Sequence, residues 1–153
     1  MQWILKKFND LTVDEFHDIL QLRINIFVVE QNCPYPELDD RDKIAFHFFG
    51  INKENKIIAY TRIFKPGDYY EEAAFGRVAV HQDYRNQKIG FQLVEQTIIE
   101  IHKLFGNINI KIGAQTYLNN FYQSFGFHQV GDDYIEDGIP HIHMLINKPS
   151  NNE

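Results

Sequence analysis

The chain has 153 residues, of which 24% are charged and 44% are hydrophobic, and its formal net charge is −6 at pH 7. This length predicts a single domain with a sizeable core, and the acidic balance argues against nucleic acid as the main partner. No apolar run approaches the length that spans a membrane, so no membrane partner is expected. The single cysteine, Cys33, cannot form an internal disulfide, which favours a reducing compartment, and we expect a cytoplasmic protein.

The first part of the chain predicts a strand, a helix and a polar loop. Residues 2–8 read as the strand. Thr12 with Glu15 makes a capping box that starts a helix, and helical spacing of apolar residues continues to about residue 29. Two prolines then hold an extended segment. We interpret the charged run 37–43 that follows as a solvated connection.

The middle of the chain predicts three strands and a long helix. Residues 44–52 and 56–65 form two strands, joined by a hairpin loop in which Asn55 can adopt a positive φ. Residues 75–80 form the third strand. Residues 88–104 carry apolar side chains on one face and polar ones opposite, which predicts an amphipathic helix that stops near Gly106.

The last part predicts a strand over 108–112, a short helix over 117–125 and two further strands, 127–131 and 139–146. Asp132–Asp133 and Asp137–Gly138 separate the last two strands. This order of elements predicts one α/β domain over residues 1–147, with a mixed, mostly antiparallel sheet covered by helices, and a polar tail over 148–153.

An anion site is predicted where the strand 75–80 leads into the long helix. The turn between them carries Arg85 and Lys88, and Gly90 opens the helix. The first N–H groups of a helix have no internal partner, and the helix dipole adds positive charge, so a diphosphate fits there. Gly90 lets a ligand approach the backbone closely. The glycine spacing matches neither a P-loop nor a dinucleotide-binding fingerprint.

The pattern Val-x-Val-x-x-x-Tyr-Arg-x-x-x-Ile-Gly-x-x-Leu, which begins at Val78, resembles motif A of the GNAT N-acetyltransferases. Arg85 and Gly90 match the ends of Arg/Gln-x-x-Gly-x-Gly/Ala, while Lys88 replaces the middle glycine. The resemblance implies acetyl-CoA as co-substrate and a splay of the sheet that opens a slot for it. It also implies that these residues bind the cofactor: Val78, Ala79, Val80, Arg85, Asn86, Gln87, Lys88, Ile89 and Gly90.

The stretch 113–127 resembles motif B of the same family. Tyr122 matches the family tyrosine, Gly126–Phe127 match its Gly-Phe, and Gln115 stands where an asparagine is usual. The resemblance implies that Gln115 binds the pantetheine arm and that Tyr122 is the general acid for the leaving thiolate, a role that suits a phenol. The alternative is that Tyr122 only packs in the core.

Residues 22–35, together with 114–115, 120–127 and 136–142, resemble the ElaA-like branch of the GNAT superfamily. Lys88 and Gln115 also occur in that branch, so both departures are features of the branch. This resemblance spans nearly the whole chain.

Two residues, Glu30 and His141, are candidates for the general base. Glu30 follows the apolar helical stretch and either binds and deprotonates a cationic amine or is a solvated residue at a helix end. His141 has a pKa range suited to a base, or it is a hydrogen-bonded structural histidine. Arg77 either orients a carboxylate of the acceptor or pairs with an acid of the fold, and for Arg23 we favour structural pairing.

Metal and cysteine chemistry have weaker support. His141 and His143 share one face of a strand, but no zinc-binding motif accompanies them, and we expect no functional metal. Cys33 precedes a proline and has no base nearby in the sequence, so we do not expect a nucleophile there.

These observations predict an acetyl-CoA-dependent N-acyltransferase that moves an acetyl group to a primary amine of a small molecule or peptide by direct attack. One alternative is a non-catalytic acyl-CoA-binding or sensor module, and another is an interaction protein without a cofactor. The paired edge strands are compatible with a homodimer. The sequence does not identify the acceptor.

Overall fold

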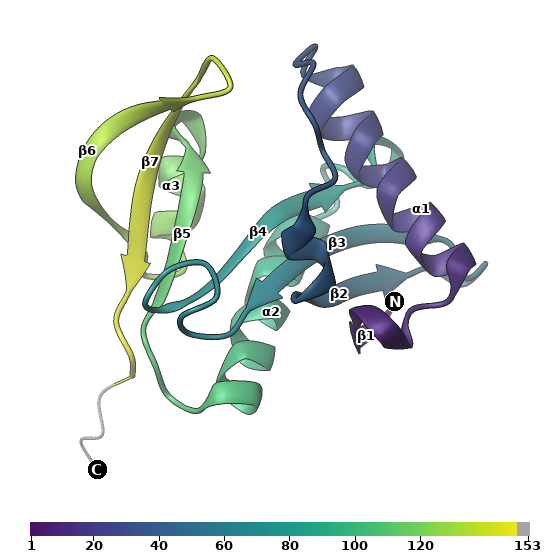
Figure 1. Ribbon diagram of the computed structural model, residues 1–153, viewed down its shortest axis with the longest axis horizontal. Coiled ribbons are helices and arrows are strands. Elements are labelled where there is room, and N and C mark those ends of the chain that lie inside the picture. Colours follow the sequence, from purple (N-terminus) through teal and green to yellow (C-terminus); the bar gives the residue numbers. More distant parts are fainter. Residues whose placement is uncertain (150–153) are drawn as a thin grey trace.

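The computed structural model describes residues 1–149, and its elements follow the predicted order (Figure 1). The strands are β1 Gln2–Lys7, β2 Phe46–Ile51, β3 Ile57–Phe64, β4 Ala73–Val80, β5 Ile110–Gln115, β6 His128–Glu136 and β7 Ile139–Ile146. The helices are α1 Val13–Ile24, α2 Ile89–Phe105 and α3 Asn119–Gln123. Most of the predicted polar tail, residues 150–153, lies outside the described residues.

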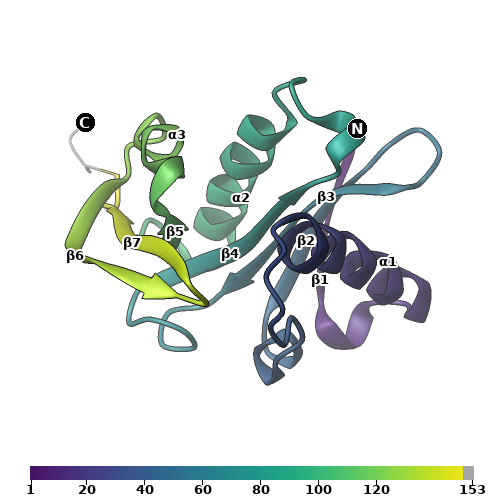
Figure 2. The same cartoon turned by 90° about the horizontal axis from the view of Figure 1, so that it is seen from above.

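The strands form one sheet in the order β1-β2-β3-β4-β5-β7-β6. β4 and β5 are parallel, and the other neighbouring pairs are antiparallel. α1 covers one face of the sheet, and α2 and α3 cover the other (Figure 2). This arrangement confirms the predicted fold class. No helix within residues 1–149 combines the length and apolar character needed to cross a membrane.

Local sequence signals set the ends of the helices. In the capping box of α1, Thr12 accepts a hydrogen bond from the Glu15 backbone at 3.0 Å, and the Glu15 carboxylate accepts one from the Thr12 backbone at 2.9 Å. The helical path continues past α1 as a π-helical turn, Asn25–Glu30, which confirms the predicted extent. Gly106 ends α2 with a φ of 87°, and Asn55 makes the β2–β3 hairpin turn with a φ of 60°.

The apolar face of α2 packs against the sheet and forms most of the core. Leu93, Val94 and Ile101 are fully buried. Thr97 is buried among them although it is polar, because its hydroxyl donates to the Leu93 carbonyl at 2.6 Å and lies 3.1 Å from the hydroxyl of Thr61 on β3. The core therefore fixes α2 on the sheet, and with it the position of the helix N-terminus.

The sheet splays between its two parallel strands. β4 and β5 pair only at Ala73–Ile110 and Ala74–Lys111, and then they diverge (Figure 1). A bulge in β4 accompanies the divergence: the register with β3 shifts between Tyr60 and Arg62, and Arg77 takes a φ of 52°. Beyond Ala74 the edge of β4 that faces β5 is unpaired. The predicted splay is therefore present, and it leaves backbone N–H and C=O groups available to a ligand.

The prediction that residues 132–138 separate two strands is partly wrong. β6 runs through Asp132–Asp133 as one long strand, and only the two-residue turn Asp137–Gly138 separates it from β7. The register between β6 and β7 shifts from Val130 to Tyr134, which marks a bulge where Gly131 has a φ of 76°. The polar residues that resemble a turn are those of a bulged edge strand.

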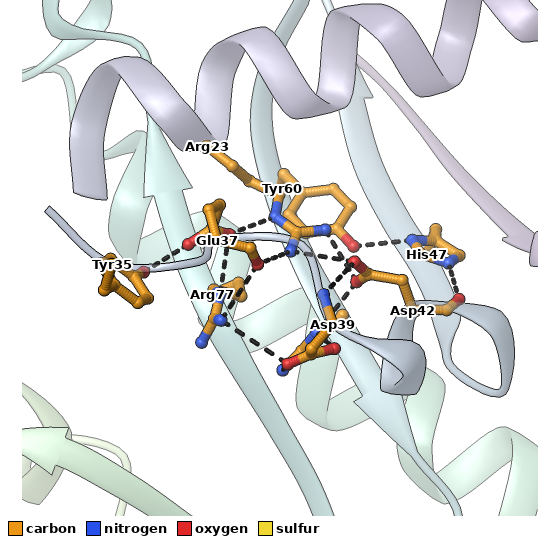
Figure 3. Close-up of polar contacts among 9 residues, drawn as sticks. Arg23, Tyr35, Glu37, Asp39, Asp42, His47, Tyr60 and Arg77 are labelled. Atoms are coloured by element: carbon orange, nitrogen blue, oxygen red, sulfur yellow. Dashed lines mark hydrogen bonds and ion pairs between the residues drawn. The ribbon is translucent and has the colours of Figure 1, made fainter. Parts of the chain in front are cut away.

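The interpretation of residues 37–43 as a solvated connection is also partly wrong, because Asp40, Arg41 and Lys43 are exposed but two of the acids are not. Glu37 and Asp42 are only 4% and 2% exposed. Both form ion pairs with the fully buried Arg23 of α1, at 2.6 and 2.9 Å, as Figure 3 shows. This confirms the structural pairing favoured for Arg23. The hydrogen bonds and charges of Arg23 and Arg62 hold the pKa of Asp42 below its usual value although burial acts in the opposite direction.

Candidate active site

A cavity of about 700 Å³ occupies the opening between β4 and β5. It extends from the N-terminus of α2, past β4 and the 26–35 segment, to the turn between β6 and β7. The cavity therefore joins the predicted anion site at residues 85–90 with the stretch 113–127 that resembles motif B. Its size is within the range of small-molecule and cofactor sites.

The N-terminal end of α2 is built for close approach to an anion. Asn86 and Lys88 have φ values of 63° and 61°, so the turn before the helix uses two left-handed residues that are not glycine. Lys88 stands where the family pattern has a glycine, and the position does require a positive φ, at a cost of about 1–2 kcal/mol for a residue with a Cβ. The strained turn leaves the first N–H groups of α2 free to bind a ligand.

No contact or backbone conformation within the described residues requires a glycine at position 90. Its φ is not positive, and an added Cβ would meet only Val80 Cγ2, at 3.8 Å, which is ordinary van der Waals contact. Glycine in a helix is less favourable than alanine by about 0.5–1 kcal/mol. The empty space over the Gly90 backbone therefore fits a ligand such as the diphosphate of coenzyme A, which needs the room that a side chain would fill.

Arg85 and Glu30 form an ion pair across the mouth of the cavity. The Arg85 guanidinium donates to both carboxylate oxygens of Glu30, at 2.5 and 2.8 Å, and also to the Val80 carbonyl at 3.3 Å. These hydrogen bonds from Arg85 lower the pKa of the Glu30 carboxyl, which weakens it as a base. The residue predicted to bind the diphosphate is thus paired with one of the two candidate bases.

Tyr122 reaches the cavity from α3 on the other side. The residue is only 4% exposed, yet it is part of the cavity wall. Within residues 1–149 no hydrogen bond contributes to its pKa, which burial raises, so the phenol stays protonated near neutral pH. A protonated hydroxyl can donate a proton or a hydrogen bond to a ligand.

His141 faces the same cavity from β7. Its Nδ1 lies 2.7 Å from the Ile139 carbonyl oxygen, and its Nε2 lies 3.7 Å from a carboxylate oxygen of Glu136. A carbonyl oxygen can only accept, so Nδ1 carries the proton and Nε2 is the basic nitrogen of the neutral ring. Gln115 is the cross-strand partner of His141, and its amide donates to Gln31 at 3.2 Å.

Aromatic residues close the end of the cavity beside His141. Tyr134 on β6 stacks on His143, with ring centroids 4.4 Å apart, and Tyr70 meets the edge of His143 at 5.6 Å. Both tyrosine hydroxyls lie over Gly113 of β5, where an added Cβ would be 2.7 Å from Tyr134 Oη and 3.2 Å from Tyr70 Oη. Gly113 therefore makes room for these two side chains.

The structure brings together most of the predicted site residues. The cavity wall contains eleven of them: Glu30, Val78, Val80, Arg85, Asn86, Lys88, Ile89, Gly90, Gln115, Tyr122 and His141. Ala79 is buried against α1 and Gln87 lies outside the wall. In the described part of the chain no three His, Cys, Asp or Glu residues gather as a metal site. Cys33 also lines the cavity, and its thiol lies 3.5 Å from the Asp137 carbonyl.

One group of wall residues is not predicted from the sequence, namely Tyr35, Tyr70, Tyr134 and Glu136. They come from three different loops and strands, so no local spacing groups them. A glycine inside an apolar strand, Gly113, was the available signal, because it indicates that other side chains approach the backbone closely.

Known proteins share both the sequence pattern and the fold. A family model described as an acetyltransferase (GNAT) domain matches residues 27–148. The ElaA protein of Escherichia coli K12 is 41% identical over 146 residues, which are 94% of this chain and 95% of that protein. A UPF0039 protein of Synechocystis is 37% identical and covers 99% of this chain and 98% of its own. The chain therefore belongs to the GNAT acetyltransferase family.

Solved structures agree with this assignment. An acyl-CoA N-acyltransferase from Pseudomonas aeruginosa is 35% identical, has a TM-score of 0.90, and covers 95% of this chain and 98% of its own. E. coli ElaA has a TM-score of 0.88 at 39% identity, covering 95% of this chain and 99% of its own. The resemblance to the ElaA-like branch is thus confirmed. The chain is an N-acetyltransferase of the GNAT type, an enzyme that transfers an acyl group.

Proposed function

We propose that this enzyme transfers the acetyl group of acetyl-CoA to a primary amine by direct attack of the amine on the thioester. The observation that carries the proposal is the shared cavity, whose wall contains the N-terminus of α2 together with Tyr122 and His141. The co-substrate supplies an activated acyl group. The residues of the chain supply binding, orientation and proton transfer.

The cofactor end of the cavity would hold the diphosphate. The first N–H groups of α2, the open backbone of Gly90 and the cations Arg85 and Lys88 suit this anion. The unpaired edge of β4 near Val78 and Val80 would bind the pantetheine arm as an added strand does, and its N–H groups would polarise the thioester carbonyl. Gln115 would donate to the arm from the opposite strand.

Proton transfer would fall to two residues. His141 Nε2 accepts the proton that the amine loses as the new N–C bond forms, because the Ile139 carbonyl holds the proton of the ring on Nδ1. Tyr122 donates its hydroxyl proton to the sulfur as the C–S bond breaks. We prefer His141 to Glu30 as the base, because Arg85 engages both oxygens of Glu30 and lowers its pKa.

Glu30, which pairs with Arg85, would affect co-substrate binding. Glu30 competes with the diphosphate for Arg85, so it would set the affinity for the co-substrate rather than remove a proton. The acceptor would enter from the face that carries His141 and the tyrosine wall, which consists of Tyr70 and Tyr134. A small molecule or the end of a peptide would suit an opening of this kind. A cytoplasmic location and a homodimer stay predictions.

Calorimetric titration with acetyl-CoA and with free CoA tests the binding step first. We expect both to bind, and we expect acetyl-CoA with a suitable amine to release free thiol. If neither compound binds, the assignment of the cofactor end is wrong. If both bind but no amine among a broad panel releases thiol, the chain acts as the acyl-CoA sensor that the sequence left as an alternative.

A further inference from the structure

Three arginines and three acids meet beside the cavity, between α1, the segment 35–43 and strands β3 and β4. The members are Arg23, Arg62, Arg77, Glu37, Asp39 and Asp42. Figure 3 shows how the labelled side chains converge from the helix, the segment and the sheet. Their formal charges cancel, so the cluster as a whole needs no ligand for charge balance.

The carboxylate oxygens of the cluster are fully engaged. Glu37 accepts from Tyr35 with one oxygen and from both Arg23 and Arg77 with the other. Asp39 accepts from Arg62 with both of its oxygens. Asp42 accepts from Arg23 and Arg62. The acids therefore have little capacity left for further donors.

The surplus of donors lies on the arginines that line the cavity. Every nitrogen of the Arg23 guanidinium has an acceptor, and Arg23 is not part of the cavity wall. Arg77 is part of the wall, with its side chain 21% exposed. Its Nε donates to Glu37 at 2.8 Å, but its Nη2 makes only longer contacts, 3.3 Å to the Glu37 carbonyl and 3.8 Å to Asp39.

The outer terminal nitrogen of Arg77, Nη1, has no acceptor in the described part of the chain. One terminal nitrogen of Arg77 lies on the side away from the labelled acids in Figure 3. The Nη1–Nη2 edge of a guanidinium matches the two oxygens of a carboxylate. The free edge of Arg77 therefore suits a carboxylate from outside the protein.

Two backbone features support a ligand at this place. Arg77 adopts its positive φ of 52° at the β4 bulge, a conformation that a non-glycine residue keeps only where the surroundings enforce it. Gly76, its neighbour in the cavity wall, has no positive φ, and an added Cβ would meet no atom within 4 Å. Open space thus adjoins the free edge of Arg77, while Arg62, also in the wall and cross-strand from Gly76, adds a second cation.

We propose that the acceptor is a free amino acid, whose carboxylate binds the free edge of Arg77 while its amine faces His141. This inference rests on the proposed function. Because the cluster itself is neutral, a bound carboxylate adds one negative charge near Glu37 and Asp39, whereas a phosphate dianion would add two and meet stronger repulsion. Arg77 directly precedes Val78, where the thioester carbonyl would lie, so only a few bonds separate the carboxylate from the amine.

The test compares amino acids with the amines that lack the carboxylate. The pairs are leucine with isoamylamine, phenylalanine with phenethylamine, and alanine with ethylamine, each assayed by thiol release from acetyl-CoA. We expect kcat/KM at least about tenfold higher for the amino acid in the best pair, mainly through KM, because a charged hydrogen-bonded pair is worth this much or more. Arg77→Gln should bring that ratio close to one.

A control variant and a binding measurement show whether an effect is specific to the carboxylate site. Arg41→Gln removes an arginine that is not itself part of the cavity wall, although it lies over the ring of Tyr69 in that wall, and it should leave the ratio unchanged. Thermal unfolding of both variants shows whether the fold persists. Titration of the CoA-saturated protein with N-acetylleucine and with N-isoamylacetamide measures the carboxylate site without turnover, and we expect only the first to bind measurably.

The outcomes separate this inference from the proposed function. Equal turnover of amino acids and amines, or an equal loss for both in Arg77→Gln, would overturn the inference and leave N-acetyl transfer intact. Failure to bind or consume acetyl-CoA would overturn the proposed function. In that case N-acetylleucine binding to the free protein decides the inference alone, and no binding, or binding unchanged by Arg77→Gln, would overturn it too.

Discussion

Replacing Gly90 by alanine should have opposite effects on the stability of the fold and on the affinity for CoA. The added Cβ meets only Val80 Cγ2, at 3.8 Å, so the free protein can hold it without strain. Alanine is favoured over glycine in a helix by about 0.5–1 kcal/mol, and the melting temperature should therefore rise by about 1–4 °C. The same methyl group would stand where the diphosphate approaches the backbone. Overpacking of about 1–3 kcal/mol there would raise the Kd for CoA roughly 5- to 150-fold.

Two measurements on purified Gly90→Ala check this prediction, namely thermal unfolding and calorimetric titration with CoA. Gly76→Ala is a matched control, because Gly76 also lacks a positive φ and has open space around its Cβ position, but it lies beside Arg77. The control should bind CoA as the unmodified protein does. If Gly90→Ala binds CoA with unchanged affinity, the diphosphate does not lie against this backbone and the reasoning is refuted.

Three further changes probe the proton transfers, the ion pair and the buried network. Tyr122→Phe should lower kcat by about 10²–10⁴-fold with little change in CoA affinity, as a lost general acid does, and an unchanged kcat would exclude that role. Glu30→Gln should strengthen CoA binding up to about fivefold, the worth of an exposed ion pair, and should leave kcat intact; loss of kcat would instead make Glu30 the base. Burial lowers the pKa of His47 in the folded state from 6.5, so stability is fully present above about pH 6.5 and declines as the pH falls toward the folded-state pKa. Urea midpoints at several pH values should show this decline in the unmodified protein and a weaker one in His47→Gln, and identical slopes would contradict it.

Local signals predicted the elements that position the cofactor end of the site. The capping box at Thr12, the left-handed turn at Asn55 and the apolar face that ends at Gly106 all depend on residues close in sequence. Such signals are strong because the backbone conformation at each position follows from the residues themselves. The motif around Arg85 and Gly90 is readable for the same reason.

Contacts between distant residues explain what the sequence could not show. Glu37 and Asp42 look like surface charges until Arg23 and Arg62, which lie 14 to 20 positions away, bury them in ion pairs. Arg77 joins the same cluster from 40 positions beyond Glu37. Pairing partners at such separations leave no local pattern, so composition alone suggested a solvated loop.

The edge strand β6 shows the same limit in the sheet. Its residues Asp132–Asp133 follow a glycine with a positive φ and resemble a turn, yet pairing with β7 carries the strand across them with a bulge. The bulge then turns Tyr134 toward His141 and His143, which is how the tyrosine wall of the cavity forms. Tertiary pairing overrode the local preference at this point.

The central claim is direct transfer of the acetyl group to an amine, and one measurement tests it most directly. Protein, acetyl-CoA and an amine are mixed, and free thiol and acetylated amine are quantified together by mass spectrometry over time. The account predicts that the two products appear in equal amounts and that the protein itself gains no acetyl group. Thiol release without acetylated amine, or an acetyl group retained on the protein before the amine is modified, would contradict the account.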